Sequence, residues 1–268
     1  MAGNVSSQFI SGLALAAPLT GERTEISLTT PLQSAAYVDI TLKAAEQFGI
    51  RAVWRGESLV IEGGQFYKTP GEADVEGDWS NAAFWLAAAA AGDGRARVPG
   101  LDVRSPQGDK GIIGLLRLFG AKVSVSEGAV AVEGGRLSAA RIDVDATPDL
   151  APVLALLGAA AEGETVLTNI ARLRLKESDR AASITQTLAA LGADIRLEDD
   201  CIKVRGRGRI AGGSCDAQGD HRIAMMAACA AVIAQGPITI GGAQAVNKSY
   251  PLFFEDLQSL GLKCKREE

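Results

Sequence analysis

The feature that most constrains the fold is a helix ending that recurs four times, about every seventy residues along this 268-residue chain. In each copy, apolar residues at helical spacing lead to a large apolar residue and then a glycine, which can adopt the left-handed conformation that ends many helices. A period of this length indicates one structural unit used several times. The four endings are Phe48-Gly49, Phe119-Gly120, Leu191-Gly192 and Leu260-Gly261.

A second helix, rich in alanine, is predicted before each of these outer helices. Because its sequence is apolar on all sides, we expect it to be an inner, buried helix in every repeat. Its start contains residues suited to capping a helix. The predicted starts are 6–8, 80–81, 148–149 and 220–222, and the apolar runs behind them are 9–18, 82–91, 150–161 and 223–234.

Strands are predicted at two places in the repeat. A short β-branched stretch follows the inner helix and a hairpin pattern follows the outer helix. The fold class is therefore α/β, built from repeated α-β-α-β-β units. In the fourth repeat, 262–265 begins a strand that lacks a partner. The single strands are 25–28, 96–98, 165–167 and 237–240, and the hairpins are 52–54 with 59–61, 122–125 with 129–132, and 194–197 with 201–204.

A domain boundary is predicted within 62–78, the segment richest in turn-forming residues. It contains Gly63-Gly64, Pro70-Gly71 and Gly77, which interrupt regular structure. We therefore expect one domain over 1–75, holding a single repeat, and a second domain over 76–268, holding three.

Composition excludes several classes of function. Hydrophobic residues make up 47% and aromatic residues 5%, which is typical of a globular α/β protein. The net charge of −5 provides no general attraction for nucleic acid. Four cysteines without CxxC spacing and a single histidine, His221, predict no metal site and suit a reducing compartment. With no signal-peptide pattern and no apolar run that could span a bilayer, we expect a cytoplasmic protein without a membrane partner.

Charge is concentrated in segment 172–180, Arg-Leu-Arg-Leu-Lys-Glu-Ser-Asp-Arg, which carries four cations and two carboxylates. Ser178 or Asp179 can cap a helix over 181–191. The cations can hold an oxyanion, and Glu177 can move a proton. A solvated helix start would account for the same spacing equally well.

Two further clusters favour a functional site over a solvated helix start. They are Gly219-Asp220-His221-Arg222 and Asn247-Lys248-Ser249-Tyr250-Pro251. Together with segment 172–180 they resemble the 5-enolpyruvylshikimate-3-phosphate synthase (3-phosphoshikimate 1-carboxyvinyltransferase) family. Members of that family carry a Lys-Glu-Ser/Thr-Asp-Arg stretch and an Asp-His-Arg helix start in this order. The resemblance covers most of the chain and begins at 3–8.

The resemblance implies a two-domain architecture with three repeats in each domain and the active site between the domains. Segment 3–8 is similar to the start of the third repeat, so the chain would correspond to the last four of six. The first two repeats would then be absent, along with a strand that could pair with 262–265. A complementary N-terminal polypeptide, or self-association, would complete the molecule.

The resemblance also implies a reaction of the shikimate pathway, at a step that glyphosate targets. The enolpyruvyl group of phosphoenolpyruvate is transferred to the 5-hydroxyl of shikimate 3-phosphate, with release of phosphate and without a cofactor or metal. The implied catalytic residues are Asp149, Glu177 and Lys248. Those implied to bind shikimate 3-phosphate are Ser6, Ser7, Gln8, Ser34, Tyr37, Asp149 and Lys176, and those implied to bind phosphoenolpyruvate are Gln8, Arg180, His221, Arg222 and Lys248.

Several of these residues have simpler structural explanations. Helix capping alone would explain Ser6, Ser7 and Asp149, although the serines can both cap a helix and bind substrate; Ser80-Asn81 is predicted to be a cap and nothing else. The chain also departs from its relatives at two places. Ala35 and Ala36 stand where a basic residue is common, and Arg172 replaces an asparagine that reaches the substrate in many relatives.

Two alternative functions remain open on the sequence. One is the related enolpyruvyl transferase that acts on UDP-N-acetylglucosamine, although the motif context favours the shikimate enzyme. The other is a non-catalytic fragment that binds anions without turning them over, because residues of the missing repeats cannot be supplied by fold resemblance.

Overall fold

The computed structural model describes residues 1–92 and 94–266, which form two compact units. Unit 1 consists of Met1–Gly77 and Asp102–Lys110. Unit 2 consists of Asp78–Leu101 and the described residues of Gly111–Glu268. Each unit has its own hydrophobic core and is described separately below.

Unit 1 contains one copy of the predicted repeat. Two helices pack on each other, and a three-stranded antiparallel sheet has the order β1-β3-β2. Its core includes Ile10 from the first helix, Val38 from the second, and Leu59 and Ile61 from the sheet. The elements are α1 (Ser7–Ala16), β1 (Thr24–Ser27), α2 (Ala35–Gln47), β2 (Ala52–Arg55) and β3 (Ser58–Ile61).

Unit 2 contains three further copies, which confirms the repeated α/β fold. The first has α3 (Trp79–Ala91), β4 (Arg95–Pro99), α4 (Ile112–Leu118), β5 (Lys122–Ser126) and β6 (Ala129–Glu133). The second has α5 (Ala151–Ala160), β8 (Gly163–Thr168), α6 (Arg180–Ala190), β9 (Asp194–Glu198) and β10 (Cys201–Gly206). The third has α7 (His221–Cys229), β12 (Ile238–Gly241) and α8 (Phe253–Ser259).

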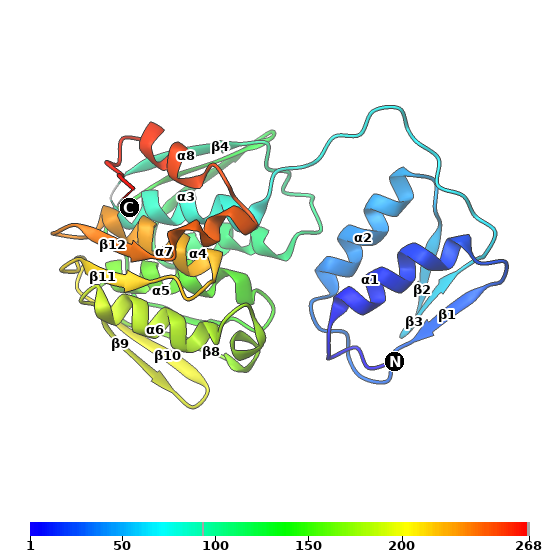
Figure 1. The fold of residues 1–268 in the computed structure, drawn as a ribbon, viewed down its shortest axis with the longest axis horizontal. Coiled ribbons are helices and arrows are strands. Elements are labelled where there is room, and N and C mark those ends of the chain that lie inside the picture. The colour runs from blue at the N-terminus through cyan, green and yellow to red at the C-terminus, as the bar shows by residue number, and fades with distance from the viewer. Residues whose placement is uncertain (93, 267–268) are drawn as a thin grey trace. The chain divides into compact units, whose positions relative to one another are not determined.

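The inner helices α3, α5 and α7 contact one another at the centre of unit 2, with sheets and outer helices around them (Figure 1). All the residues of α5 from Ala151 to Ala159 are buried, as its apolar sequence predicts. The same expectation is wrong for α1. Phe9 is 60% exposed and Leu13 is 49% exposed, because only one side of α1 packs against α2 and the sheet.

The glycines that end the four outer helices all adopt the left-handed conformation, which confirms the repeat that the sequence predicts. Their φ angles are 82° at Gly49, 96° at Gly120, 90° at Gly192 and 99° at Gly261. A residue with a Cβ atom would be strained there, so these glycines set where each outer helix stops.

Two short strands of unit 2 were not predicted. β7 (Arg141–Asp143) lies parallel to β8, giving a sheet with the order β7-β8-β10-β9. β11 (Gly213–Asp216) lies parallel to β12. Their sequences, Arg-Ile-Asp and Gly-Ser-Cys-Asp, are too short and too polar to show strand periodicity.

Two other predictions are wrong. The described residues of 262–265 form no strand, since a strand requires a neighbouring one for its ladder and none lies beside this segment. Helix α3 begins at Trp79 and is capped by Asp78 instead of Ser80 or Asn81. The Asp78 carboxylate accepts hydrogen bonds from both the backbone and the side-chain amide of Asn81.

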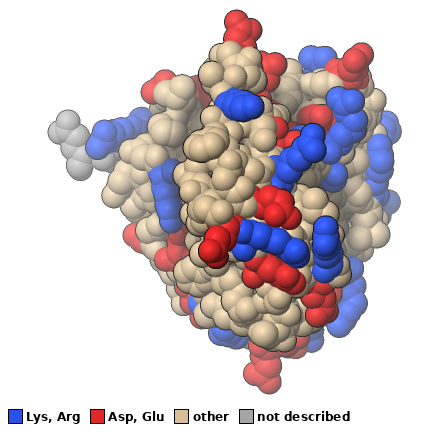
Figure 2. All heavy atoms as spheres, turned by 90° about the vertical axis from the view of Figure 1, so that its right-hand side faces the viewer, with Lys and Arg blue, Asp and Glu red and all other residues tan. Residues whose placement is uncertain are grey.

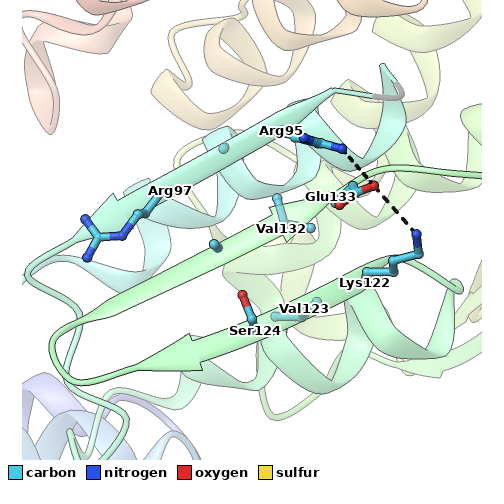
Figure 3. Close-up of a pocket in the computed structure, with 9 residues that line it drawn as sticks. Arg95, Arg97, Lys122, Val123, Ser124, Val132 and Glu133 are labelled. Carbon is cyan, nitrogen blue, oxygen red and sulfur yellow. Dashed lines mark hydrogen bonds and ion pairs between the residues drawn. The ribbon is translucent and has the colours of Figure 1, made fainter.

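The exposed surface carries charges of both signs. On the face drawn in Figure 2, Lys and Arg side chains lie interspersed with Asp and Glu. The sheet β4-β6-β5 shows this on a small scale, because Glu133 forms cross-strand ion pairs with Arg95 and Lys122 at 3.3 and 3.6 Å (Figure 3). Within residues 1–92 and 94–266, no helix combines the length and apolar character needed to cross a membrane.

Candidate functional site

The candidate site of unit 2 is organised around Arg180, whose side chain is fully buried at the first position of α6. Its guanidinium group contacts three carboxylates. Nε donates to Asp220 Oδ2 at 3.0 Å, Nη1 to Asp149 Oδ1 at 2.6 Å and Nη2 to Glu177 Oε2 at 2.5 Å. Asp179 caps α6 by accepting a hydrogen bond from the Ala182 amide, which settles the choice between Ser178 and Asp179. Arg180 therefore joins the starts of three helical segments.

Three further cations surround these carboxylates. Lys176 Nζ lies 3.3 Å from Asp149 Oδ1, and Arg222 Nη2 lies 3.5 Å from Asp149 Oδ2. Lys248 Nζ donates to Glu177 Oε1 at 3.1 Å. The cluster thus combines four cationic side chains with three carboxylates, which leaves a positive excess suited to an anion.

The start of α7 contributes two buried polar atoms. Asp220 caps this helix by accepting a hydrogen bond from the Arg222 amide at 2.9 Å. Among the described residues, neither His221 Nδ1 nor Arg222 Nη1 has a hydrogen-bond partner, although both atoms are buried. Buried polar groups are nearly always paired, so this pair is typical of a site completed by a ligand or by water.

The pKa directions follow from this arrangement. Burial raises the pKa of Glu177, but its backbone hydrogen bond and the charges of Arg180 and Lys248 outweigh burial and hold the pKa below the usual value. Burial and Arg222 lower the pKa of His221, which keeps the ring neutral at pH 7. Burial also opposes the charge of Arg180, yet Asp220 and Asp149 raise its pKa above the usual value. The resting site therefore contains an ionised Glu177 and a neutral His221.

Lys248 is carried by a firmly anchored segment. It ends the 3₁₀ helix Ala243–Lys248, and Tyr250 follows two residues later. The Tyr250 hydroxyl donates to Asp256 at 2.6 Å, and its ring packs edge-on against Trp85 and Phe253. Burial and then the Asp256 hydrogen bond raise the pKa of Tyr250 to about 12, so it remains a neutral donor.

Unit 1 holds the remaining predicted residues at the starts of its two helices. Ser6 caps α1 by accepting a hydrogen bond from the Gln8 amide, as its structural explanation predicts. Ser7 is buried, whereas Gln8 is exposed. Ser34, with a φ of 55°, directly precedes α2, and Tyr37 lies 41% exposed in its first turn.

These two helix starts are held together by the first residues of the chain. Gly3 accepts a hydrogen bond from the Gln33 amide, and Thr30 Oγ1 accepts hydrogen bonds from the amides of Gly3 and Asn4. A Cβ atom on Gly3 would lie 2.6 Å from the Thr30 carbonyl oxygen, so only glycine allows this approach. The segment before α1 is thereby fixed against the segment before α2.

The structure thus brings the predicted residues together in two groups. In unit 2, Asp149, Lys176, Glu177, Arg180, His221, Arg222 and Lys248 form one cluster. Arg172 is directed to the Asp145 carbonyl at 2.7 Å. Asp220 and Ser178 were not predicted as site residues from the sequence, because a helix cap and a serine give no chemical signal by themselves. Within the described residues, no group of His, Cys, Asp or Glu side chains has the arrangement of a metal site.

Fold and cluster together define an α/β protein with a cluster of charged side chains at the starts of its helices. Its family follows from comparison with known proteins. The model of the family described as EPSP synthase (3-phosphoshikimate 1-carboxyvinyltransferase) matches residues 1–257. The chain therefore belongs to the EPSP synthase family.

Individual relatives agree with this assignment. A 3-phosphoshikimate 1-carboxyvinyltransferase of Clostridium kluyveri is 40% identical over 260 residues, covering 97% of this chain and 61% of the relative. One from Aeropyrum pernix is 44% identical over 262 residues, covering 97% of this chain and 60% of the relative. The crystal structure of EPSP synthase from Acinetobacter baumannii matches with a TM-score of 0.80 at 30% identity, covering 97% of this chain and 61% of that chain. The chain thus spans about three fifths of the length of these relatives.

Proposed function

We propose that this chain forms part of an enzyme that transfers the enolpyruvyl group of phosphoenolpyruvate to the 5-hydroxyl of shikimate 3-phosphate, releasing phosphate. The observation that carries the proposal is the Arg180 cluster, in which residues from all three motif segments, 172–180, 219–222 and 247–251, meet at one place in unit 2. Membership of the EPSP synthase family and the enzyme names of the relatives support the same reaction.

The start of α7 is proposed to bind phosphoenolpyruvate. Arg222 offers a buried guanidinium nitrogen, Nη1, that has no partner within the described structure. An arginine with one occupied and one available nitrogen can bind a phosphate or carboxylate while staying fixed in place. The neutral His221 ring and the Lys248 ammonium group complete the clamp. Arg180 has no exposed side-chain surface, so its direct contact with the ligand would require Glu177 to move away from Nη2.

Proton transfer is proposed to involve Glu177 and Lys248. Glu177 is ionised in the resting site, and the ammonium group of Lys248 lies 3.1 Å away. The pair can give one proton to the methylene carbon of phosphoenolpyruvate and take one back when phosphate leaves. The Asp149 carboxylate lies within ion-pair distance of Arg180, Lys176 and Arg222, and its oxygens can accept a hydrogen bond from the attacking hydroxyl.

Shikimate 3-phosphate is proposed to bind the helix starts of unit 1. The N-terminus of α1 presents backbone N–H groups and the positive end of the helix dipole, which favour a phosphate. Hydroxyl and amide groups there can supply further hydrogen bonds. These side chains are Ser6, Ser7, Gln8, Ser34 and Tyr37.

The second candidate is a chain that binds these anions but turns them over only with a partner. Two observations favour it. The chain spans about three fifths of its relatives, and α1 exposes Phe9 and Leu13. We propose that a complementary polypeptide covers that face. Action on UDP-N-acetylglucosamine has no support among the relatives reported above.

The experiment that tests these proposals measures phosphate release from shikimate 3-phosphate and phosphoenolpyruvate. The chain is assayed alone and with the part of a longer relative that lies outside the match. Activity that requires both polypeptides supports the second candidate, and activity of the chain alone supports the first. No release with either, while both ligands bind, would contradict the proposed reaction.

A further inference from the structure

Asp220 is a buried charge with two separate tasks. Its Oδ1 atom accepts a hydrogen bond from the Arg222 amide at 2.9 Å and so caps α7. Its Oδ2 atom accepts hydrogen bonds from Arg180 Nε at 3.0 Å and from the Ser178 hydroxyl at 3.2 Å. The side chain is completely buried, so it is shielded from any ligand in the described structure. One carboxylate therefore connects Arg180 to the first turn of α7.

The repeat provides internal comparisons for this residue. Asp78, Asp149 and Asp220 follow one another at intervals of 71 residues and mark the starts of α3, α5 and α7. Asp78 caps its helix through the Asn81 amide. Asp149 contacts Arg180 and Lys176. Asp220 combines a helix cap with the Arg180 contact.

We propose that Asp220 is a positioning residue of the site, with Ser178 as its second anchor, and that it sets the orientation of Arg180 relative to Arg222. This inference rests on the proposed function for the identity of the ligand. It goes beyond that function because neither residue is assigned a role by the reaction or by the motif comparison.

The physical argument depends on rigidity. The hydrogen bond from Arg180 Nε to Asp220 fixes the orientation of the planar guanidinium group. Nη1 and Nη2 therefore stay directed at Asp149 and Glu177. The same carboxylate fixes the first turn of α7, where Arg222 begins its side chain. The Ser178 hydroxyl donates a second hydrogen bond to Oδ2 and itself accepts one from the Ser183 hydroxyl at 3.0 Å. Without the Asp220 charge, Arg180 and Arg222 would still share the Asp149 carboxylate, but the first turn of α7 would lose its charged link to Arg180.

The first test compares Asp220→Asn with Asp78→Asn in the 268-residue chain. Asparagine is as good a helix cap as aspartate, so both variants keep their caps, and only Asp220→Asn loses a charged partner of Arg180. The measured quantity is hydrogen exchange of the Arg180 Nε–H group by NMR. We expect it to accelerate at least tenfold in Asp220→Asn and to remain unchanged in Asp78→Asn. Equal protection in both variants would overturn the proposal, since it would reduce Asp220 to a cap.

The second test measures selectivity instead of affinity. Removing a negative charge strengthens the binding of every nearby anion, which would conceal a loss of geometry. Phosphoenolpyruvate and inorganic phosphate are therefore titrated in parallel by calorimetry, and the ratio of their dissociation constants is compared. We expect Asp220→Asn to lower the preference for phosphoenolpyruvate about tenfold, on the scale of one hydrogen bond to a charged group. An unchanged ratio would contradict a positioning role.

Ser178 provides a conservative control. Ser178→Thr keeps the hydroxyl group, whereas Ser178→Ala removes it. We expect Ser178→Ala to reproduce part of the effect of Asp220→Asn on ligand selectivity and on Arg180 Nε–H exchange. Ser178→Thr should keep the wild-type selectivity and the wild-type exchange rate. If Ala and Thr behave alike, Ser178 is not an anchor. If the wild-type chain binds no phosphoenolpyruvate, the proposed function fails, while the exchange measurement still decides whether Asp220 positions Arg180.

Discussion

Arg180 Nη1 and Asp149 Oδ1 lie 2.6 Å apart, and this hydrogen bond joins the start of α6 to the 3₁₀ turn Pro148–Leu150 that leads into α5. The two residues are 31 positions apart in the chain. The bond joins two charged groups, and the arginine side chain is fully buried. Its contribution to the stability of the fold therefore depends on every partner of Arg180 being present, because a buried charge that loses a partner is costly.

Replacing Arg180 by methionine should therefore destabilise unit 2 strongly. The substitution keeps an unbranched chain but leaves Asp149, Glu177 and Asp220 without their common cation. Breaking such a buried network costs about 3–5 kcal/mol. The measurement is urea unfolding followed by tryptophan fluorescence. Arg136→Met is the matched control, because its pair with Glu162 is exposed to solvent and should contribute far less to stability. Similar losses in the two variants would show that the Arg180 network does not stabilise the fold.

The repeats could be predicted from sequence because they follow from local rules. A glycine after Phe119 or Leu191 ends a helix whatever surrounds it, and the hairpins have turn residues at their tips. The strands β7 and β11 could not be predicted, since they exist only through pairing with β8 and β12. Tertiary context decides such short segments.

The site was predictable in part for a similar reason. Glu177 and Arg180 belong to a recognisable motif, so the sequence places them near one another. The convergence of Asp149, Asp220 and Lys248 on that motif depends on the packing of separate repeats. The burial of α1 was predicted wrongly because an apolar sequence says nothing about whether a neighbour is present to cover it.

Substituting Arg222 by lysine should weaken phosphoenolpyruvate binding. Lysine keeps the charge but loses the forked donor geometry, including the buried Nη1 atom that has no partner among described residues. The expected loss is about 1–3 kcal/mol, with little change for shikimate 3-phosphate. Titration of each ligand by calorimetry checks this. Equal weakening of the two ligands would contradict the assignment of Arg222.

Glu177→Gln should reduce turnover in the complete, active enzyme while preserving the shape of the site. The amide cannot exchange a proton with Lys248, so the rate should fall roughly 10²–10⁴-fold with modest changes in ligand binding. Stopped-time assays of phosphate release provide the measurement. Glu198→Gln serves as the control, since that carboxylate pairs with Lys203 on the exposed hairpin β9–β10. Retention of more than about a tenth of the rate would exclude Glu177 from proton transfer.

The low pKa of Glu177 also predicts how stability changes with pH. Its pKa is lower in the folded state than the ordinary value of 4.5, so the unfolded chain binds the proton more readily. The stabilisation is therefore fully present above about pH 4.5 and is lost as the pH falls through the folded-state value. Unfolding free energies measured between neutral and acid pH should decline less steeply for Glu177→Gln than for the wild type. Parallel curves would mean that Glu177 is not stabilised as an anion in the folded chain.

The exposed face of α1 leads to a prediction about partners. Leu13, the seventh residue of α1, is 49% exposed, whereas Trp85, the seventh residue of α3, is partly buried against the core of unit 2. We propose that α1 is covered in the same way by further repeats. Adding the part of the Clostridium kluyveri relative that lies outside the match should then raise the melting temperature of this chain, because a partner that binds only the folded form stabilises it.

Leu13→Glu should abolish that rise while changing the melting temperature of the chain alone very little, since the side chain is already half in water. Val53→Glu is the matched control. Val53 is 56% exposed on β2 of the same unit, and the substitution adds the same charge away from α1. The comparison is made by thermal unfolding across a series of partner concentrations. If Leu13→Glu responds to the partner as strongly as Val53→Glu and the wild type, then α1 is not the docking face, and its apolar side chains require another explanation.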